Sequence, residues 1–412
     1  MIAAHDALDQ RDRWVPPSAG SVPLDRVAGM GWHALTDLMP PVLVLKDGAL
    51  RHNLDVMARF CRAHGVSLAP HGKTTMSPQL VARQLEAGAW GVTAASPAQA
   101  RLFRAFAVSP IVIANQVVDP LGLDWMAGEL ERHPEAPVLC LVDSDRAVGL
   151  MDEALAGRGP LPVLVEMGLA GGRTGCRSVE EGRRVAAAVR RSRSLWLAGV
   201  ECFEGVVHDP EQVDGVLGET RALCEALARE GTFDELDEVL VTAGGSAHFD
   251  RVVHHLAGGW ELGRPARVVL RSGCYLTHDH GDYERLSPFG GRLPEWEPLR
   301  QAMEVWGLVH SRPEPDLAIV GFGKRDVSYD LGLPRPLHVS SRDGRRRDAE
   351  GMEVFRLNDQ HAYVRVPPGD DLAVGDLLGC GLSHPCTVFD KWRSIPVVDD
   401  GDRVIGAIRT YF

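Results

Sequence analysis

The chain has 412 residues, of which 45% are hydrophobic and 24% are charged, a composition typical of a globular protein with room for more than one domain. Its formal net charge of -12 argues against nucleic acid or an anionic membrane as a partner. No apolar run approaches the roughly 18 residues that cross a bilayer, and residues 1–14 are too polar for a signal peptide, so we expect a cytoplasmic protein. The eight cysteines form no Cys-x-x-Cys pair, which predicts reduced core residues rather than a disulfide framework.

The first part of the chain predicts a parallel barrel. Residues 41–46 predict a strand and residues 50–64 an amphipathic helix. Short apolar runs then alternate with longer stretches of helical spacing, and the eight runs are 66–69, 91–95, 111–115, 138–142, 162–166, 197–203, 238–242 and 267–271. Continuous apolar runs suit parallel strands that are buried on both faces. Eight such units predict a (β/α)8 barrel.

The pattern changes after residue 271. From about residue 304, segments of alternating polarity are separated by Gly, Pro and Asp, which predicts a second, antiparallel β domain. The strand at 41–46 could pair into that sheet. We therefore expect a barrel over residues 47–290 and a discontinuous β domain formed by 1–46 and 291–412. The run Arg345-Arg346-Arg347 suggests a solvated hairpin tip.

Polar residues follow the predicted barrel strands, at the end of the barrel where active sites lie in this fold. In chain order they are Lys73, Asn115, Asp143, Glu166 with Arg173, Glu204, Gly244-Gly245-Ser246 and Ser272-Gly273-Cys274-Tyr275. Because the strands end at one rim, these side chains should meet at one mouth.

Lys73 is the most informative of these residues. An amine in a partly dry pocket can lose its proton and attack a carbonyl, which is how lysines form imines with substrates or with pyridoxal phosphate. The glycine-rich turns at 244–246 and 272–274 would suit a phosphate, because small residues expose backbone N–H groups there. The alternatives are a solvated surface lysine and two ordinary βα turns.

A set of motifs runs from residue 41 to about residue 396. The motifs are Pro70-His71-Gly72-Lys73-Thr74, Arg173-Thr174-Gly175 within 168–175, the segment 199–205, Gly244-Gly245-Ser246, Gly273-Cys274-Tyr275 and Leu382-Ser383-His384-Pro385-Cys386. Together they resemble the fold type III pyridoxal-phosphate enzymes, in the branch of D-serine dehydratase and D-threonine aldolase, related through the barrel to alanine racemase.

The resemblance implies specific roles. Lys73 would bind pyridoxal phosphate as a Schiff base, and Arg173 would contact the phenolic oxygen of the cofactor. The phosphate would lie against two turns, whose expected cofactor contacts are Gly244, Gly245, Ser246, Gly273, Cys274 and Tyr275. The chain departs from the family in two places: Phe203 stands where tyrosine is common, and the lysine motif reads His-Gly-Lys-Thr-Thr rather than His-x-Lys-Thr-His. A homodimer is also implied, with each mouth completed by the partner's β domain.

His384 and Cys386 form a candidate metal site. Residues two apart in an extended strand share a face, so both could bind one ion while Pro385 faces away. Imidazole and thiolate together favour zinc, whereas the alternative is a core cysteine beside a partly buried histidine. In the family resembled, aldolases carry Asp as the second ligand and dehydratases carry Cys, so Cys386 favours a dehydratase. The segment His278-Asp279-His280-Gly281-Asp282 is a competing metal candidate, or a solvated loop.

These features predict a PLP- and zinc-dependent dehydratase that converts a D-β-hydroxyamino acid, such as D-serine, into a 2-oxo acid and ammonia. Lys73 would remove the α-proton and zinc would act on the β-hydroxyl. The preference for a D substrate comes from the resemblance alone. The alternatives are a D-threonine-type aldolase, an amino acid racemase with Tyr329 or Tyr363 as second base, and a non-enzymatic carrier of the cofactor.

Overall fold

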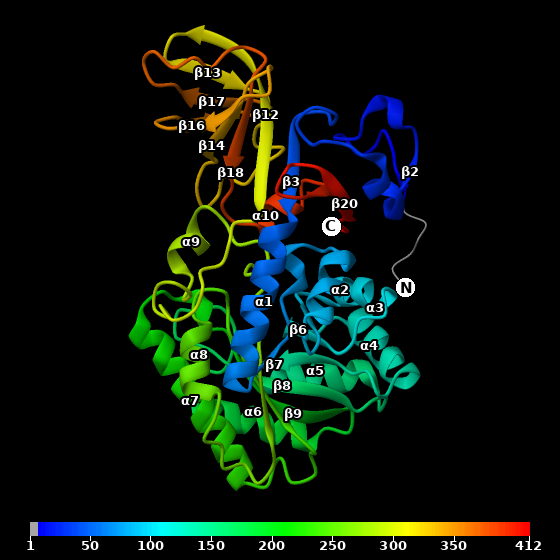
Figure 1. Ribbon diagram of the computed structural model, residues 1–412. Helices are drawn as coiled ribbons and strands as arrows, with labels where there is room; N and C mark the ends of the chain where they lie inside the picture. Colours follow the sequence, from blue (N-terminus) through cyan, green and yellow to red (C-terminus); the bar gives the residue numbers. More distant parts are fainter. Residues whose placement is uncertain (1–6) are drawn as a thin grey trace.

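The computed structural model describes residues 7–412 and consists of a parallel barrel with a second, antiparallel sheet above it (Figure 1). Within the described residues, eight parallel strands follow one another in the order β4-β11-β10-β9-β8-β7-β6-β5. They are β4 (Ser67–Leu68), β5 (Val92–Ala94), β6 (Ile111–Gln116), β7 (Val138–Val142), β8 (Leu161–Met167), β9 (Leu195–Cys202), β10 (Val239–Ala243) and β11 (Ala266–Leu270). The gap between β4 and β5 is bridged where the N–H of Trp90 donates to the carbonyl of Leu68 at 2.7 Å. The prediction of a barrel with an antiparallel second sheet is confirmed.

Helices surround this barrel and explain why its strands are apolar on both faces. They are α2 (Pro78–Glu86), α3 (Pro97–Ala105), α4 (Pro120–Arg132), α5 (Asp145–Leu155), α6 (Val179–Arg191), α7 (Pro210–Arg229) and α8 (Phe249–Leu256). Alternate strand residues such as Leu139 and Leu141 fill the barrel interior, whereas Val138 and Val142 pack outward against helices. Four helices begin with Ser-Pro or Asp-Pro, in which the Ser or Asp side chain accepts a backbone N–H and Pro occupies the first turn.

The second sheet is built around the long strand β12 (Met303–Glu314). Its other strands are β13 (Leu317–Val320), β14 (Arg335–Ser340), β15 (Arg346–Asp348), β16 (Glu353–Leu357), β17 (Ala362–Arg365), β18 (Leu377–Gly381), β19 (Ser394–Val398) and β20 (Val404–Arg409). The early strand β3 (Val42–Lys46) pairs with β12 and β19, before α1 (Asp47–His64) leads into the barrel. The triple-arginine run is not simply a solvated tip, because Arg346 and Arg347 lie in β15 and form ion pairs with Asp402 and Asp370.

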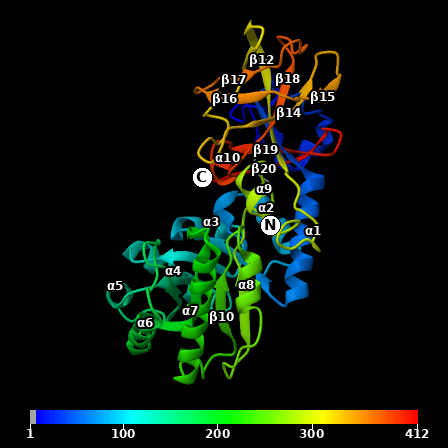
Figure 2. The ribbon, with the colours of Figure 1, turned by 90° about the vertical axis from the view of Figure 1, so that its left-hand side faces the viewer.

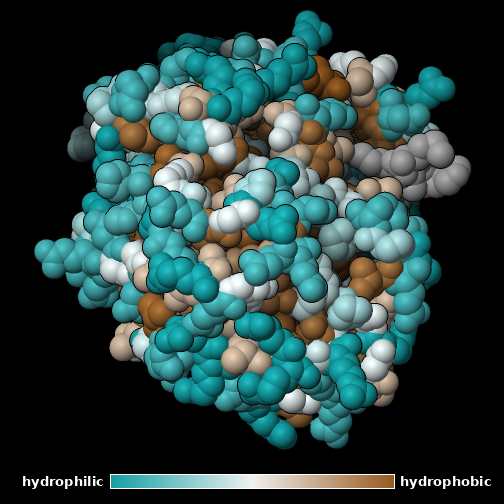
Figure 3. All heavy atoms as spheres, turned by 90° about the horizontal axis from the view of Figure 1, so that it is seen from below, coloured by the Kyte–Doolittle hydropathy of each residue, from teal (hydrophilic) through white to brown (hydrophobic). Residues whose placement is uncertain are grey.

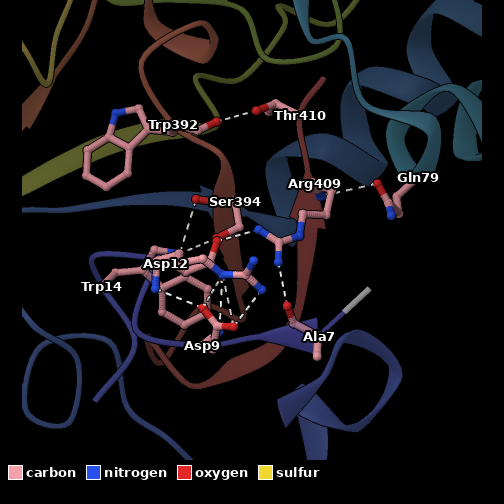
Figure 4. Close-up of polar contacts among 10 residues, drawn as sticks. Ala7, Asp9, Asp12, Trp14, Gln79, Trp392, Ser394, Arg409 and Thr410 are labelled. Carbon is pink, nitrogen blue, oxygen red and sulfur yellow. Dashed lines mark hydrogen bonds and ion pairs between the residues drawn. The ribbon is translucent and has the colours of Figure 1, made fainter. Parts of the chain in front are cut away.

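The N-terminal segment is fixed to the last two strands by a buried polar cluster (Figure 4). The Asp12 carboxylate is 3% exposed and accepts hydrogen bonds from Ser394 Oγ at 2.7 Å and from Arg409 Nη1 at 2.5 Å. Arg409 also donates to the carbonyl of Ala7, and Trp14 Nε1 donates to Ser394 Oγ. This part of the chain contains β1 (Ala7–Leu8), β2 (Val22–Pro23) and the 3₁₀ turns η1 (Pro17–Ala19) and η2 (Leu24–Met30).

The mouth of the barrel lies toward the second sheet (Figures 1 and 2). Two short helices occupy this junction, α9 (Asp282–Leu286) and α10 (Cys386–Phe389), together with the 3₁₀ turns η3 (Gly72–Thr74) and η4 (Glu204–Val206). The opposite end of the molecule, seen in Figure 3, is mostly hydrophilic with scattered apolar residues. Among residues 7–412, no helix combines the length and apolarity needed to cross a membrane.

Candidate active site

A cavity of about 330 Å³ lies where the barrel mouth meets the second sheet. Most of the residues expected at the site line it. They are Lys73, Arg173, Gly244, Gly245, Ser246, Gly273, Cys274, His384 and Cys386. The cavity therefore brings together side chains from both ends of the chain, up to 313 positions apart, around one amine.

Lys73 reaches the cavity from η3, just after β4. Two glycines allow the surrounding turns to pack closely: a Cβ on Gly72 would lie 2.4 Å from the Phe103 ring, and a Cβ on Gly273 would lie 2.6 Å from the carbonyl oxygen of His71. Burial and the charges of nearby Lys73 and Arg271 lower the pKa of His71 well below its usual range. Its imidazole is therefore neutral and does not add a third positive charge beside the amine.

The glycine turn after β10 is occupied differently from what its sequence suggests. The N–H groups of Gly244 and Gly245 donate to the two carboxylate oxygens of Glu204, at 3.0 and 2.6 Å, so they are not free for a phosphate. Ser246 Oγ accepts the N–H of Cys274 at 3.2 Å, which links this turn to the one after β11. Among the hydrogen bonds of the described chain, none is donated by the backbone N–H of Ser246 or Gly273, and both residues line the cavity.

The loop that carries Arg173 is held from below by acidic side chains. Glu166 accepts a hydrogen bond from Thr174 Oγ1 at 2.7 Å, and Asp143 accepts the N–H of Gly175 at 3.1 Å. The Arg173 guanidinium lies over the Phe203 ring, 4.8 Å from its centroid. Phe203, the departure from the family's usual tyrosine, thus forms the platform on which Arg173 rests.

Arg271 also lines the cavity. The sequence pattern did not identify it as a site residue, because it is the last residue of an otherwise apolar run. It is 4% exposed and forms a buried ion pair with Glu201. It also donates to Thr242 Oγ1 and to the carbonyl of Cys202, both at 2.9 Å. These contacts fix a positive charge at the base of the cavity. An arginine at the end of a buried strand is the sequence signal that could have identified it.

His384 and Cys386 both line the cavity, but not as members of an extended strand. His384 has a left-handed backbone with φ of 47°, and Pro385 turns the chain so that α10 begins at Cys386. The fixed φ of proline suits the start of a helix, so the extended geometry expected here was wrong. His384 Nδ1 lies 2.5 Å from Asp330 Oδ2, and Cys386 Sγ lies 3.4 Å from Thr74 Oγ1 and 3.8 Å from Cys274 Sγ. Hydrogen bonds to Cys386 and Asp330 raise the pKa of His384 to about 9.

The competing cluster at 278–282 has a structural role. The Asp279 carboxylate accepts backbone N–H groups from Gly281, Tyr283 and Glu284 at the start of α9, and from His384 at 3.0 Å. Both oxygens of Asp279 thus already accept backbone hydrogen bonds. In the part of the chain that the structure describes, no group of three or more His, Cys, Asp or Glu side chains is arranged to hold a metal.

The predicted tyrosines do not reach the cavity. Tyr275 turns away, and its buried hydroxyl accepts a hydrogen bond from Gln84 at 3.1 Å. Tyr329 is exposed, and the hydroxyl of Tyr363 accepts from Asn358 in the second sheet. Tyr283, which the sequence did not single out, does line the cavity from α9.

Comparison with known proteins places this site in a family. The model of the "Alanine racemase, N-terminal domain" family matches residues 46–265, and that of the "Putative serine dehydratase domain" family matches residues 302–398. A D-threonine aldolase of Arthrobacter sp is 28% identical over 403 residues, which cover 94% of this chain and 93% of that protein.

Solved structures show the same architecture. The D-threonine aldolase from Filomicrobium marinum superposes with a TM-score of 0.74 and 26% identity, covering 91% of this chain and 95% of that one. The D-threo-3-hydroxyaspartate dehydratase from Delftia sp. HT23 superposes with a TM-score of 0.70 and 22% identity, covering 91% and 98%. The second of these likenesses supports the fold alone.

Proposed function

The chain belongs to the alanine racemase N-terminal domain family, within the fold type III pyridoxal-phosphate enzymes, and from this premise we propose that it is a zinc-dependent dehydratase of D-β-hydroxyamino acids. Its relatives are lyases of D-hydroxyamino acids. The observation that carries the finer proposal is the meeting of Lys73, His384 and Cys386 in one cavity. An amine that can remove an α-proton thus lies beside the pair of side chains suited to a thiophilic metal.

The cavity fits pyridoxal phosphate in its donor groups. Lys73 would hold the cofactor covalently, and the unengaged N–H groups of Ser246 and Gly273 would bind its phosphate. The Arg173 guanidinium is held in place by its loop and by the Phe203 ring, so it can bind an anionic ring oxygen without reorganising. When bound, the cofactor supplies an acceptor for the electron pair that is left when the α-proton departs.

The chain's own groups then move the protons. With the cofactor and substrate bound, the Lys73 amine would be the group placed to accept the α-proton on Nζ. Arg271 lies in the base of the cavity with its charge fixed by Glu201, and it favours anionic groups there. The imidazole of His71 beside Lys73 is neutral, so it adds no further positive charge at this side of the cavity.

The metal proposal rests on two donors of the right kind. Imidazole and thiolate suit zinc, and Asp330 orients the His384 ring through Nδ1, as outer-shell carboxylates do for metal-bound histidines. In the part of the chain that the structure describes, no third His, Cys, Asp or Glu completes a metal-binding group with these two, so substrate and water would complete the coordination. Zinc, when bound, supplies a Lewis acid for the substrate's β-hydroxyl.

An aldolase is the second candidate, and the curated relative supports it. The D-threonine aldolase of Arthrobacter shares 28% identity with this chain. An aldolase would deprotonate the β-hydroxyl and break the Cα–Cβ bond, whereas a dehydratase expels that hydroxyl. Cys386 favours the dehydratase, because the aldolases of the family resembled carry Asp at that place.

The test compares products. Purified protein is incubated with D-serine, D-threonine and D-3-hydroxyaspartate, with and without prior chelation, and ammonia with 2-oxo acid is assayed against glycine with aldehyde. We expect ammonia from a D-β-hydroxyamino acid, loss of that activity on chelation, and recovery with zinc. Glycine and aldehyde formed faster than ammonia from every substrate would establish the aldolase instead. Borohydride should fix the cofactor to the peptide that contains Lys73, and Lys73→Ala should abolish this labelling.

A further inference from the structure

Glu204 has no place in the chemistry described above, although it lies at the barrel mouth. It is fully buried, with 0% of its surface exposed, and comes from η4 directly after β9. Its two oxygens accept the N–H groups of Gly244 and Gly245, at 3.0 and 2.6 Å. Among the ion pairs formed by residues 7–412, none involves Glu204, so these two N–H groups stabilise its buried carboxylate.

The two hydrogen bonds that Glu204 accepts restrict the orientation of the glycine turn. Two successive N–H groups in a glycine turn, with Gly244 at a φ of 100°, form a concave anion site. Here the anion is a side chain of the same protein. Because burying a carboxylate is costly unless its hydrogen bonds are kept, the turn cannot rotate without breaking both contacts. Glu204 therefore fixes the orientation of the turn after β10.

The opposite side of the same turn is held by the next strand. Ser272 Oγ donates to the carbonyl of Gly245 at 3.0 Å and lies 3.3 Å from that of Gly244. Ser246 Oγ, one residue further on, accepts the N–H of Cys274 at 3.2 Å. The N–H groups of the turn are therefore bound by Glu204, which follows β9, and its carbonyl groups by Ser272, which follows β11. Among the described residues of these two turns that line the cavity, Ser246 and Gly273 have backbone N–H groups that donate no hydrogen bond.

We propose that Glu204 is a positioning residue for phosphate: it occupies the Gly244-Gly245 site permanently, so that the cofactor phosphate binds one step along the turn, at Ser246 and Gly273. This inference rests on the proposed function, because it assumes that the cavity binds pyridoxal phosphate. In this proposal the N–H groups of Gly244 and Gly245 bind the Glu204 side chain, and they do not bind the ligand. Glu204 acts through the turn and does not touch the cofactor.

The test separates phosphate binding from binding of the ring. Full-length protein freed of cofactor is titrated with pyridoxal phosphate and with pyridoxal, which lacks the phosphate. In Glu204→Gln one N–H loses its acceptor, and the new amide NH₂ faces it. We expect affinity for pyridoxal phosphate to fall by about tenfold or more, the equivalent of one hydrogen bond to a charged group, while affinity for pyridoxal changes by less than about threefold.

Two further variants keep the test decisive. Glu129→Gln removes another buried carboxylate, which pairs with Arg104 and Arg132 away from the cavity, and should leave the preference for the phosphate unchanged. Ser272→Ala removes the hydrogen bond to the carbonyl of Gly245 in the same turn. It should lower the preference for pyridoxal phosphate over pyridoxal even if Glu204→Gln folds poorly.

The outcomes distinguish two failures. If the unmodified protein binds pyridoxal phosphate and pyridoxal equally well, the proposed phosphate site is wrong, and the role of Glu204 falls with it. If the unmodified protein prefers the phosphate, but Glu204→Gln and Ser272→Ala lose both ligands equally, lose neither, or bind the phosphate more tightly, the inference about Glu204 alone is overturned.

Discussion

Asp279 should stabilise the protein and also position the candidate metal ligand His384. Its side chain is 1% exposed, and its carboxylate accepts backbone N–H groups from two segments. Oδ1 accepts from Gly281 and Tyr283 at 2.9 Å and from Glu284 at 3.3 Å, at the start of α9. Oδ2 accepts from His384 at 3.0 Å. The carboxylate therefore joins the loop after the barrel to the turn that carries the two candidate metal ligands.

The magnitude follows from these contacts. Loss of a side-chain cap at a helix start costs about 1 kcal/mol, and a lost hydrogen bond to a charged group costs roughly 1.5–3 kcal/mol. Asp279→Ala should therefore reduce the free energy of unfolding by about 3 kcal/mol. Asp279→Asn keeps one oxygen for α9, but its NH₂ group faces the N–H of His384, so it should cost about 1.5 kcal/mol.

Two measurements test this reasoning. Urea unfolding of the metal-free variants gives the change in stability. Zinc titration gives the metal affinity, which should fall by about tenfold in Asp279→Asn because the backbone of His384 is then no longer held in place by a hydrogen bond to residue 279. Asp282→Asn is the matched control, since Asp282 pairs with Arg285 at the surface of the same segment and should change stability by less than about 0.5 kcal/mol. An Asp279→Asn protein with unchanged zinc affinity and stability would refute the link between the two segments.

Three other predictions concern stability, pH and assembly. Arg409→Met should lower the free energy of unfolding by about 3 kcal/mol, because it leaves the Asp12 carboxylate buried without its partner (Figure 4). Adding Asp12→Asn should restore part of that stability in urea unfolding. A loss below about 1 kcal/mol in the single variant would contradict this prediction. Burial lowers the pKa of His278 to about 4, so the unfolded chain binds a proton there between pH 6.5 and about 4 and the folded protein does not. This residue should therefore contribute a loss of about 3 kcal/mol of stability as the pH decreases through that window. His278→Asn should reduce the pH dependence by that amount, while the contribution of His280, whose pKa is also lowered to about 4, remains. For the expected homodimer, Leu331→Glu should shift sedimentation toward the monomer, because Tyr329, Leu331 and Leu333 expose an apolar surface beside Asp330; a wild-type monomer would refute this.

The barrel could be predicted from the sequence because most residues of its strands are buried on both faces. Leu139 and Leu141 point into the barrel while Val138, Cys140 and Val142 point outward, so the whole segment is apolar and stands out from the helices around it. The turn at Pro385 could not be predicted in the same way. Its local residues are compatible with a strand, and the helix at Cys386 is fixed by tertiary contacts with Thr74 and Asp330, far away in the sequence.

In the site, too, the sequence predicts which segments meet, but it does not predict the contacts between residues that are far apart in the chain. The rule that barrel active sites lie where strands end was enough to bring Lys73, Arg173 and the two glycine turns to one mouth. It could not tell which N–H groups of those turns are free. A glycine turn followed by small residues reads as a phosphate site whether its N–H groups face a ligand or a buried carboxylate, and only the position of Glu204 in space distinguishes the two.

This distinction bears on how phosphate-binding motifs are interpreted in related barrels. A glycine motif reports that backbone approaches something closely, and the partner can be a ligand or another part of the protein. In this chain Gly273 has both properties, because a Cβ there would lie 2.6 Å from the His71 carbonyl while its own N–H remains without a partner among the described residues. Glycine at 273 is therefore required by packing even if no ligand binds. Binding data for pyridoxal phosphate against pyridoxal, rather than the motif, would show which N–H groups serve the cofactor.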